Sequence, residues 1–187
     1  MYLVVGLGNP GPKYADNRHN VGFMVAELLA ERWKAGAFRE KFKAVFSKTS
    51  YRGDDVVLLE PQTYMNLSGE SVQAAMRFFK VPLERVLVVH DELDLAFEDV
   101  RIKVGGGTAG HNGLKSIVQQ CGGNGFVRIR VGIGRPRSGA TEGYVLSAFD
   151  TDQKARLDDV LVRAATLVES VIDEGPAAAM NRHHTKK

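Results

Sequence analysis

The chain has 187 residues, of which 44% are hydrophobic and 25% charged, so it is typical of one folded domain and excludes a disordered or fibrous protein. Its single cysteine, Cys121, excludes an intramolecular disulfide and therefore a small disulfide-stapled scaffold. The net charge of +3 indicates no class of partner, and no apolar run approaches the roughly 18 residues needed to cross a membrane.

Strand-like and helix-like patterns alternate along the chain, which predicts an α/β domain. We expect strands at 3–7, 42–50, 56–60, 85–89, 100–104 and 126–133, and helices at 20–34, 68–79, 114–121 and 152–173. Asn20 and Ser68 are the expected N-caps of the first two helices. One domain over 1–187 is expected, with a mobile surface loop at 134–141 and a mobile basic tail at 178–187. The start, MYLVVGL, lacks the basic segment of a signal peptide, and the lone cysteine favours the cytoplasm.

Two glycine-rich loops resemble nucleotide-binding motifs without fitting them. GLGNPG at 6–11 has the dinucleotide spacing, but Pro10 and Pro12 remove amide donors where a pyrophosphate would bind. GGGTAGHNG at 105–113 lacks the Gly-Lys-Ser/Thr of a Walker loop. Its amides could instead hold an anion or a carbonyl oxygen, with a flexible connection as the alternative. The sequence also has no G-x-S-x-G or H-E-x-x-H motif, and we expect no metal and no cofactor.

A histidine and a carboxylate follow two of the expected strands. His19 lies where the first loop enters the first helix, and Asp91 follows the central strand 85–89 in the sequence HDELD. Ligands of open α/β sheets bind beyond the carboxyl ends of such strands, so both residues can face one crevice. A carboxylate that orients a histidine and stabilises its protonated form creates a general base. Alone, His19 is more typical of a cap or a surface residue.

Four asparagines recur in the loops, namely Asn9, Asn20, Asn66 and Asn112. An amide side chain donates and accepts hydrogen bonds without a charge, so it can read a substrate amide or polarise a carbonyl. Each asparagine alone is more typical of a turn or a cap. Together with a histidine and an aspartate, they indicate hydrolysis of a neutral acyl bond by activated water.

The basic residues are unevenly distributed along the chain. Seven Lys and Arg and no Asp or Glu lie between 101 and 141, whereas the rest of the chain holds 18 basic and 22 acidic residues. Arg128 and Arg130 are two apart on an expected strand and therefore share one face. This segment predicts a phosphate-binding surface, with a solvated strand face as the alternative.

Five stretches of the chain, in this order, closely resemble the bacterial-type peptidyl-tRNA hydrolases. They are VVGLGNPGPKYADNRHNVGF at 4–23, PQTYMNLSGESV at 61–72, VVHDELDL at 88–95, GGGTAGHNGLKSI at 105–117 and RIRVGIGRP at 128–136. The resemblance covers nearly the whole chain. It implies a single-domain α/β/α sandwich around a twisted mixed sheet, acting as a monomer that cleaves the ester between a peptide and the 3′ ribose of tRNA.

The same resemblance implies roles for individual residues. His19 would be the general base, Asp91 would orient and stabilise it, and Asn9 would recognise the acylated amino group of the substrate. The peptide and the tRNA 3′ end would contact Tyr14, Tyr64, Met65, Asn66, His111 and Asn112. Lys103 and Arg130 would bind tRNA phosphates. The sequence departs from the family at Ala96-Phe97-Glu98, where a Pro-Pro-Gly turn is common, which puts the geometry leading to Lys103 in question.

Two other classes of function stay open at this point. The basic segment alone would also fit an RNA-binding module without catalysis, and the GLGNPG loop would fit a dinucleotide oxidoreductase. Loss of turnover on substitution of His19 separates the hydrolase from the RNA-binding module, whereas specific binding of NAD(P)H would indicate the oxidoreductase.

Overall fold

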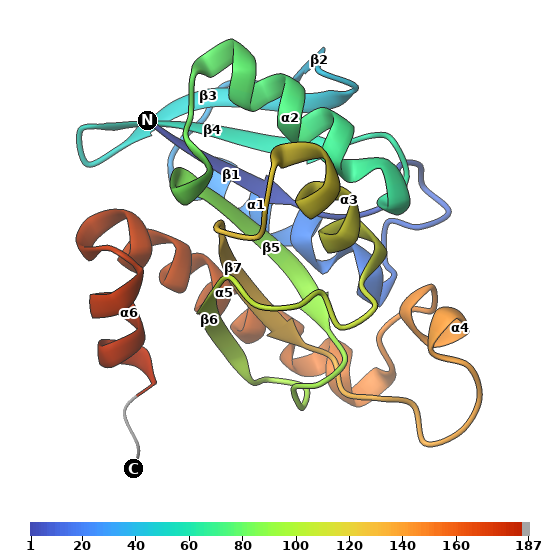
Figure 1. The fold of residues 1–187 in the computed structure, drawn as a ribbon. Coiled ribbons are helices and arrows are strands. Elements are labelled where there is room, and N and C mark those ends of the chain that lie inside the picture. Colours follow the sequence, from blue (N-terminus) through green and yellow to red (C-terminus); the bar gives the residue numbers. More distant parts are fainter. Residues whose placement is uncertain (185–187) are drawn as a thin grey trace.

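The computed structural model describes residues 1–184 and contains one seven-stranded sheet with helices on both faces (Figure 1). The strands are β1 (Tyr2–Gly6), β2 (Arg39–Lys41), β3 (Ala44–Tyr51), β4 (Asp54–Pro61), β5 (Val86–Glu92), β6 (Val100–Val104) and β7 (Val127–Gly132). The α-helices are α1 (Val21–Arg32), α2 (Ser68–Phe79), α3 (Asn112–Cys121), α4 (Thr141–Val145), α5 (Thr151–Glu174) and α6 (Pro176–His183). Short 3₁₀ turns are η1 (Arg18–Asn20), η2 (Met65–Leu67) and η3 (Leu83–Arg85).

The sheet is mixed, in the order β2-β3-β4-β1-β5-β7-β6. β4, β1, β5 and β7 run parallel to one another, while β2, β3 and β6 are antiparallel to their neighbours. One apolar core lies between the sheet and helices α1, α5 and α6, and a second lies between the other face and helices α2 and α3. The expected three-layer α/β/α fold is therefore confirmed, and the carboxyl ends of the parallel strands meet at one edge.

Glycines allow β1, α1 and β5 to approach closely at this edge. A Cβ at Gly6 would collide with the backbone of Gly22 on α1, and a Cβ at Gly22 would collide with Leu7 and with the carbonyl of Val89 on β5. Leu7 in turn donates its amide to the Val89 carbonyl at 3.1 Å. The first turn of α1 is therefore held directly against the end of β5.

Two expected caps have other functions in the structure. Asn20 occupies the N-cap position of α1, but its side chain makes no cap hydrogen bond and instead binds the main chain of Asn9. Ser68 is the first residue of α2, and its hydroxyl donates to the carbonyl of Met65 at 2.7 Å. Both side chains stabilise loops beside the sheet edge and leave the helix termini to backbone turns.

The chain after 175 differs from the expected mobile tail at 178–187. It is helical through His183, because the apolar residues Ala179 and Met180 pack into the core beside β6. His184 Nε2 accepts the amide hydrogen of Ile102 at 3.1 Å. Residues 185–187 lie outside the described residues.

The Ala96-Phe97-Glu98 sequence forms a closed turn without the family's glycine. The amide of Asp99 donates to the Ala96 carbonyl at 3.0 Å, and Glu98 adopts a φ of 81°. Arg156 pairs with the Glu98 carboxylate and Arg163 donates to its carbonyl, so α5 stabilises this unusual backbone conformation. The turn therefore still leads into β6.

Replacing Gly22 with alanine should destabilise the protein, because the new methyl group meets the backbone of Leu7, just after β1, and of Val89 on β5. We expect a loss of about 1–3 kcal/mol in the free energy of unfolding, measured by urea denaturation. Gly36→Ala is the matched control, since a Cβ there meets nothing within 4 Å. Equal stability of both variants would contradict the close approach.

Glu60 is a buried carboxyl group on β4, 6% exposed, and its Oε2 has no hydrogen-bond partner among the described residues. Burial, and secondarily the charge of Glu27, raises the pKa of Glu60 to about 8. A carboxyl whose pKa is raised on folding stabilises the folded state below its unfolded pKa, and that contribution is lost as the pH rises.

We therefore expect the stability of the protein to fall between pH 4.5 and about 8 through Glu60. Glu60→Gln cannot ionise, so its stability relative to the wild type should increase over this window by on the order of 4 kcal/mol. Thermal unfolding at pH 5, 6.5 and 8 measures the difference. A constant difference at all three values would show that Glu60 does not titrate in this way.

Candidate active site

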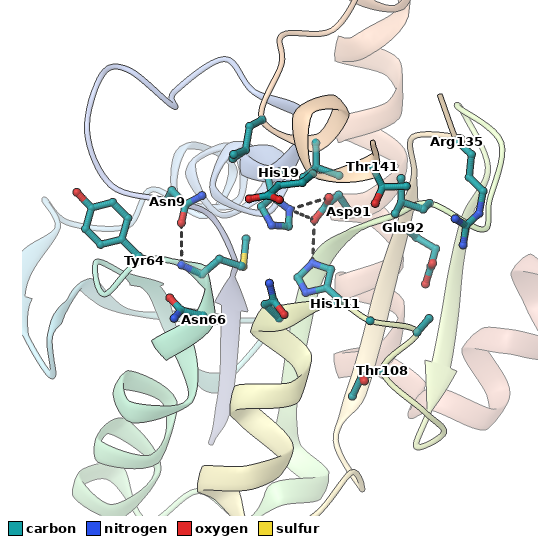
Figure 2. A pocket seen from close by; sticks show the side chains of 18 residues that line it. Asn9, His19, Tyr64, Asn66, Asp91, Glu92, Thr108, His111, Arg135 and Thr141 are labelled. Atoms are coloured by element: carbon teal, nitrogen blue, oxygen red, sulfur yellow. Dashed lines mark hydrogen bonds and ion pairs between the residues drawn. The ribbon is translucent and has the colours of Figure 1, made fainter. Parts of the chain in front are cut away.

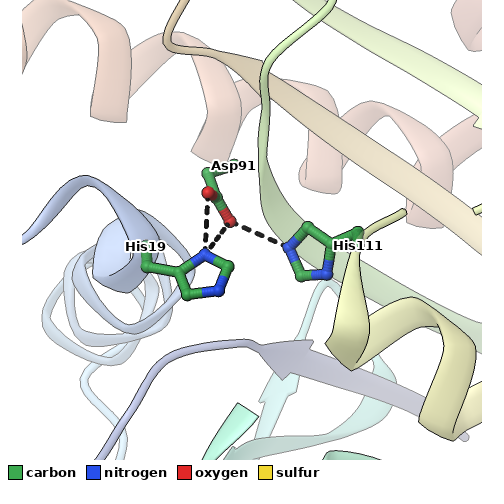
Figure 3. A group of neighbouring side chains, drawn as sticks. All are labelled: His19, Asp91 and His111. Atoms are coloured by element: carbon green, nitrogen blue, oxygen red, sulfur yellow. Dashed lines mark hydrogen bonds and ion pairs between the residues drawn. The ribbon is translucent and has the colours of Figure 1, made fainter. Parts of the chain in front are cut away.

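His19, Asp91 and His111 meet at the carboxyl edge of the sheet (Figure 3). His19 comes from η1, Asp91 from β5 and His111 from the N-cap position of α3. The Nδ1 of His19 lies 2.8 and 2.9 Å from the two carboxylate oxygens of Asp91, and the Nε2 of His111 lies 2.9 Å from Oδ1. Asp91 is 2% exposed, so one buried carboxylate accepts hydrogen bonds from two imidazoles.

The surroundings determine which nitrogen of each ring carries the proton. The Nδ1 of His111 accepts the amide hydrogens of Gly113 and Leu114 at 3.1 and 3.3 Å, so the ring proton is on Nε2, which donates to Asp91. Asp91 accepts, so His19 carries its proton on Nδ1. The lone pair of His19 Nε2 is therefore available to a ligand, as a general base requires.

The carboxylate stays ionised although it is buried. Burial by itself would raise the pKa of Asp91, but the charges and hydrogen bonds of His19 and His111 hold it well below its usual range. The neighbouring His90 is fully enclosed, and its burial lowers its pKa to about 3, so it is neutral. His90 therefore adds no charge to the site, and Asp91 is the ionised group of this cluster.

Asn9 is held in one orientation by its neighbours. The side chain of Asn20 donates to the Asn9 carbonyl and accepts its amide hydrogen, both at 2.9 Å. The Oδ1 of Asn9 accepts the amide hydrogen of Met65 at 2.7 Å. This bond identifies the oxygen end of the amide and leaves Nδ2 as the end that can donate to a ligand (Figure 2).

A cavity of about 450 Å³ opens over these groups (Figure 2). It brings together eight of the residues expected from the sequence: Asn9, His19, Tyr64, Met65, Asn66, Asp91, His111 and Asn112. Tyr64 adopts a φ of 67°, a backbone conformation that is rare outside glycine and is found at ligand sites. Tyr14 lies outside the lining, with its ring edge-on to Tyr64 at 6.3 Å between centroids.

Other lining residues were not predicted from the sequence. They are Glu92, Leu93, Thr108, Ala109, Gly110, Arg135, Thr141, Glu142, Val145 and Leu146. Thr108 to Gly110 belong to the glycine-rich loop 105–113, which therefore forms part of the cavity wall. Leu146 and the residues of α4 form a wall of the cavity. Residues with such a role belong to no catalytic motif, so the sequence carried no signal for them.

The basic segment 101–141 is not the uniform surface that the sequence indicated. Arg128 is 2% exposed and donates to the carbonyls of Gly106 and Gly107, so it anchors the glycine-rich loop and offers no phosphate contact. Arg130 pairs with Glu92 at 3.1 Å. Arg101 and Arg135 likewise pair with Asp99 and Asp94, so acidic residues from 92–99 offset part of the positive charge of this segment. Lys103 is half-buried and lies against Gly106, outside the cavity lining.

His19, Asp91 and His111 are also the donor types of a metal site, and their ligand atoms lie within 4.8 Å of one another. A metal on His111 Nε2 would need the lone pair of that atom. The two amide hydrogens on Nδ1 place the ring proton on Nε2, so the lone pair is not available without uncapping α3. The residues therefore fit a hydrogen-bonded cluster better than a metal centre.

Among the described residues, no helix combines the length and apolarity that crossing a bilayer would take. The architecture and the cluster define a class, an α/β protein with a carboxylate-paired histidine at the carboxyl edge of its sheet, an arrangement suited to acid–base chemistry. Comparison with known proteins then specifies the family. The family model described as peptidyl-tRNA hydrolase matches residues 3–187.

Curated relatives agree over the full length. A peptidyl-tRNA hydrolase of Sorangium cellulosum is 52% identical, covering 100% of this chain and 85% of the relative, and one of Geobacter sulfurreducens is 50% identical over 98% and 95%. The crystal structure of peptidyl-tRNA hydrolase from Acinetobacter baumannii superimposes with a TM-score of 0.91 at 38% identity, covering 97% of this chain and 93% of that one. The chain belongs to the peptidyl-tRNA hydrolase family and is an enzyme that hydrolyses peptidyl-tRNA. The expected resemblance is confirmed, and it decides against a dinucleotide oxidoreductase or a non-catalytic RNA-binding module.

The two functions of His111, capping α3 and donating to Asp91, can be separated by substitution. His111→Ala loses both, and we expect a loss of about 2–4 kcal/mol in the free energy of unfolding. His111→Asn supplies a good N-cap but does not reach Asp91, so it should recover only the roughly 1 kcal/mol due to the cap. Chemical denaturation at pH 7 measures both variants. Full recovery by asparagine would show that the bond to Asp91 contributes nothing to stability.

Proposed function

We propose that His19 is the general base of ester hydrolysis and that Asp91 orients it. A water molecule attacks the ester carbonyl and gives its proton to His19 Nε2. The resulting imidazolium donates from Nδ1 to the Asp91 carboxylate at 2.8 Å, which stabilises the charge. When the tetrahedral intermediate collapses, the Nε2 proton passes to the leaving 3′ oxygen, so the products are a peptide acid and tRNA with a free 3′ hydroxyl. The hydrogen bond between His19 and buried Asp91 is the observation that carries this assignment.

Asn9 is proposed to distinguish peptidyl-tRNA from free aminoacyl-tRNA. Because its Oδ1 is occupied by the Met65 amide, its available group is the Nδ2 donor. A donor recognises the acyl carbonyl oxygen that an N-acylated substrate adds, and it repels the free ammonium group of an aminoacyl-tRNA. The expectation that Asn9 recognises the acylated amino group is thereby refined. The proposed contact is with the carbonyl oxygen of the acyl group that the amino group carries.

The other polar groups of the cavity are proposed to hold the reacting ester and the tRNA end. Asn66 and Asn112 are exposed in the lining, on η2 and at the first residue of α3, and can donate to the developing oxyanion or to the 3′ ribose. Half-buried Tyr14 and exposed Tyr64 form an aromatic pair on which terminal bases can stack. Met65 supplies the apolar floor beside Asn9.

We further propose that Lys103 and Arg130 bind tRNA phosphates from the paired strands β6 and β7, on which Lys103 lies opposite Arg128 and Arg130 opposite Arg101. For Arg130 this requires sharing its guanidinium between a phosphate and Glu92. The expectations of a monomer that acts in the cytoplasm also stay proposals. The half-buried free thiol of Cys121 agrees with a reducing compartment.

A paired assay on N-acylated and free aminoacyl-tRNA tests these roles. Wild-type enzyme should release tRNA from the acylated substrate, and His19→Ala should lose at least about 10²-fold in kcat/KM because the base is removed. Asn9→Asp keeps the oxygen that binds Met65 but replaces the donor. It should lose selectivity for the acylated substrate, with kcat/KM lowered about tenfold or more.

Matched substitutions on α6 control for non-specific effects. His183→Ala and Asn181→Asp change the same residue types at exposed positions away from the cavity, and both should leave the rates unchanged. Normal turnover by His19→Ala would refute the general base, whereas unchanged selectivity of Asn9→Asp would refute only the role of its amide nitrogen.

A further inference from the structure

The residue before the catalytic histidine, Arg18, is buried and points away from the reaction. It is 5% exposed, and its guanidinium donates to the Tyr144 carbonyl at 3.2 Å, to Ser147 Oγ at 2.5 Å and to Gln153 Oε1 at 3.0 Å. The same group lies 3.9 Å from the centre of the Tyr144 ring. These partners are uncharged and all come from the segment 144–153, which contains the end of α4 and the start of α5.

The main chain reinforces this connection. The amide of Arg18 donates to the Ser147 carbonyl at 3.0 Å, and Asn17 forms an isolated bridge with Ala148. The hydroxyl of Tyr144 donates to the Ile133 carbonyl at the end of β7, at 2.5 Å. The loop 134–140, which leads into α4, is therefore closed at its base by Tyr144. Arg18 holds Tyr144 through the carbonyl oxygen and the ring of that tyrosine.

The segment that Arg18 holds forms one wall of the active-site cavity. Thr141, Glu142, Val145 and Leu146 line the cavity, and Thr141 lies on the same side of the site as His19 and Asp91 (Figure 2). α4 has five residues, none of them buried, and stands out from the rest of the fold (Figure 1). So short a helix is not stable by itself, so its position depends on the contacts at its end.

We propose that Arg18 is a positioning residue that holds the α4 wall and thereby sets the affinity for substrate, while the reactivity of His19 depends on Asp91. His19 and Arg18 share η1, but the imidazole is oriented by the carboxylate on β5 and not by α4. Loss of the Arg18 contacts should therefore loosen the wall and leave the hydrogen-bonded pair of His19 and Asp91 in place.

Arg18→Lys tests the proposal, because lysine keeps the charge but one ammonium group cannot reproduce the three contacts of the planar fork. We expect KM for N-acylated aminoacyl-tRNA to rise about tenfold, with kcat within about threefold of the wild type and its pH profile unchanged. Hydrogen exchange of amides 141–149 should become faster, which is a readout independent of catalysis.

Arg32→Lys is the matched control, since Arg32 joins α1 to Glu169 on α5 at 2.7 Å, outside the cavity lining. It should change neither KM nor exchange at 141–149. Tyr144→Leu removes the ring under the guanidinium, and its effect on KM should not add to that of Arg18→Lys, because both act on one contact. Ser147→Ala removes one acceptor and should raise KM by about threefold, which keeps the proposal testable if the Arg18 variant does not fold.

Three results would overturn the proposal. Unchanged KM and exchange in Arg18→Lys, with only a lower Tm, would make Arg18 a purely structural residue. A large fall in kcat with an altered pH profile would mean that Arg18 acts on His19. Full additivity with Tyr144→Leu would mean that the two residues act separately. The proposal rests on the hydrolase activity for its kinetics, but failure of that activity would appear in the wild-type enzyme, whereas failure of the proposal appears only in the variants.

Discussion

A negative charge enclosed at the end of β5 constrains the whole active site. Asp91 is almost completely removed from water, and an ionised carboxylate in such a position is stable only when hydrogen-bond donors reach it. The two donors come from separate elements, His19 from the turn before α1 and His111 from the cap of α3. Both loops must therefore converge on β5, and the cavity lies where they converge. The close contact of Gly22 with β5 permits this geometry on one side.

The sequence was sufficient to predict this convergence but not its details. The rule that ligands bind at the carboxyl ends of parallel strands placed His19 and Asp91 together, and both are in contact. It did not reveal that His111 donates to the same carboxylate, because a histidine in a glycine-rich loop has no periodic signal. Asn20 was expected as a cap, since capping depends on local spacing, whereas its actual partner, Asn9, is 11 residues away.

The remaining differences have a common physical cause. β2, α4 and α6 are short elements whose formation depends on packing with distant parts of the chain, so local patterns were too weak to predict them. Arg128 was interpreted as a surface charge because an arginine on an alternating strand usually is one. Its burial beneath the carbonyls of the glycine-rich loop depends on the crossing of that loop over β7. Arg18 was missed for the same reason.

The pairing of the basic segment has a consequence for how the enzyme holds a polyanion. Cations that neutralise RNA phosphates release condensed counterions, and this release makes binding strong in dilute salt and weak in concentrated salt. Arg128 is enclosed, and Arg130 must first give up part of its bond to Glu92, so fewer counterions are released than the number of basic residues suggests. The salt dependence of RNA binding should therefore be smaller than seven free basic residues would give.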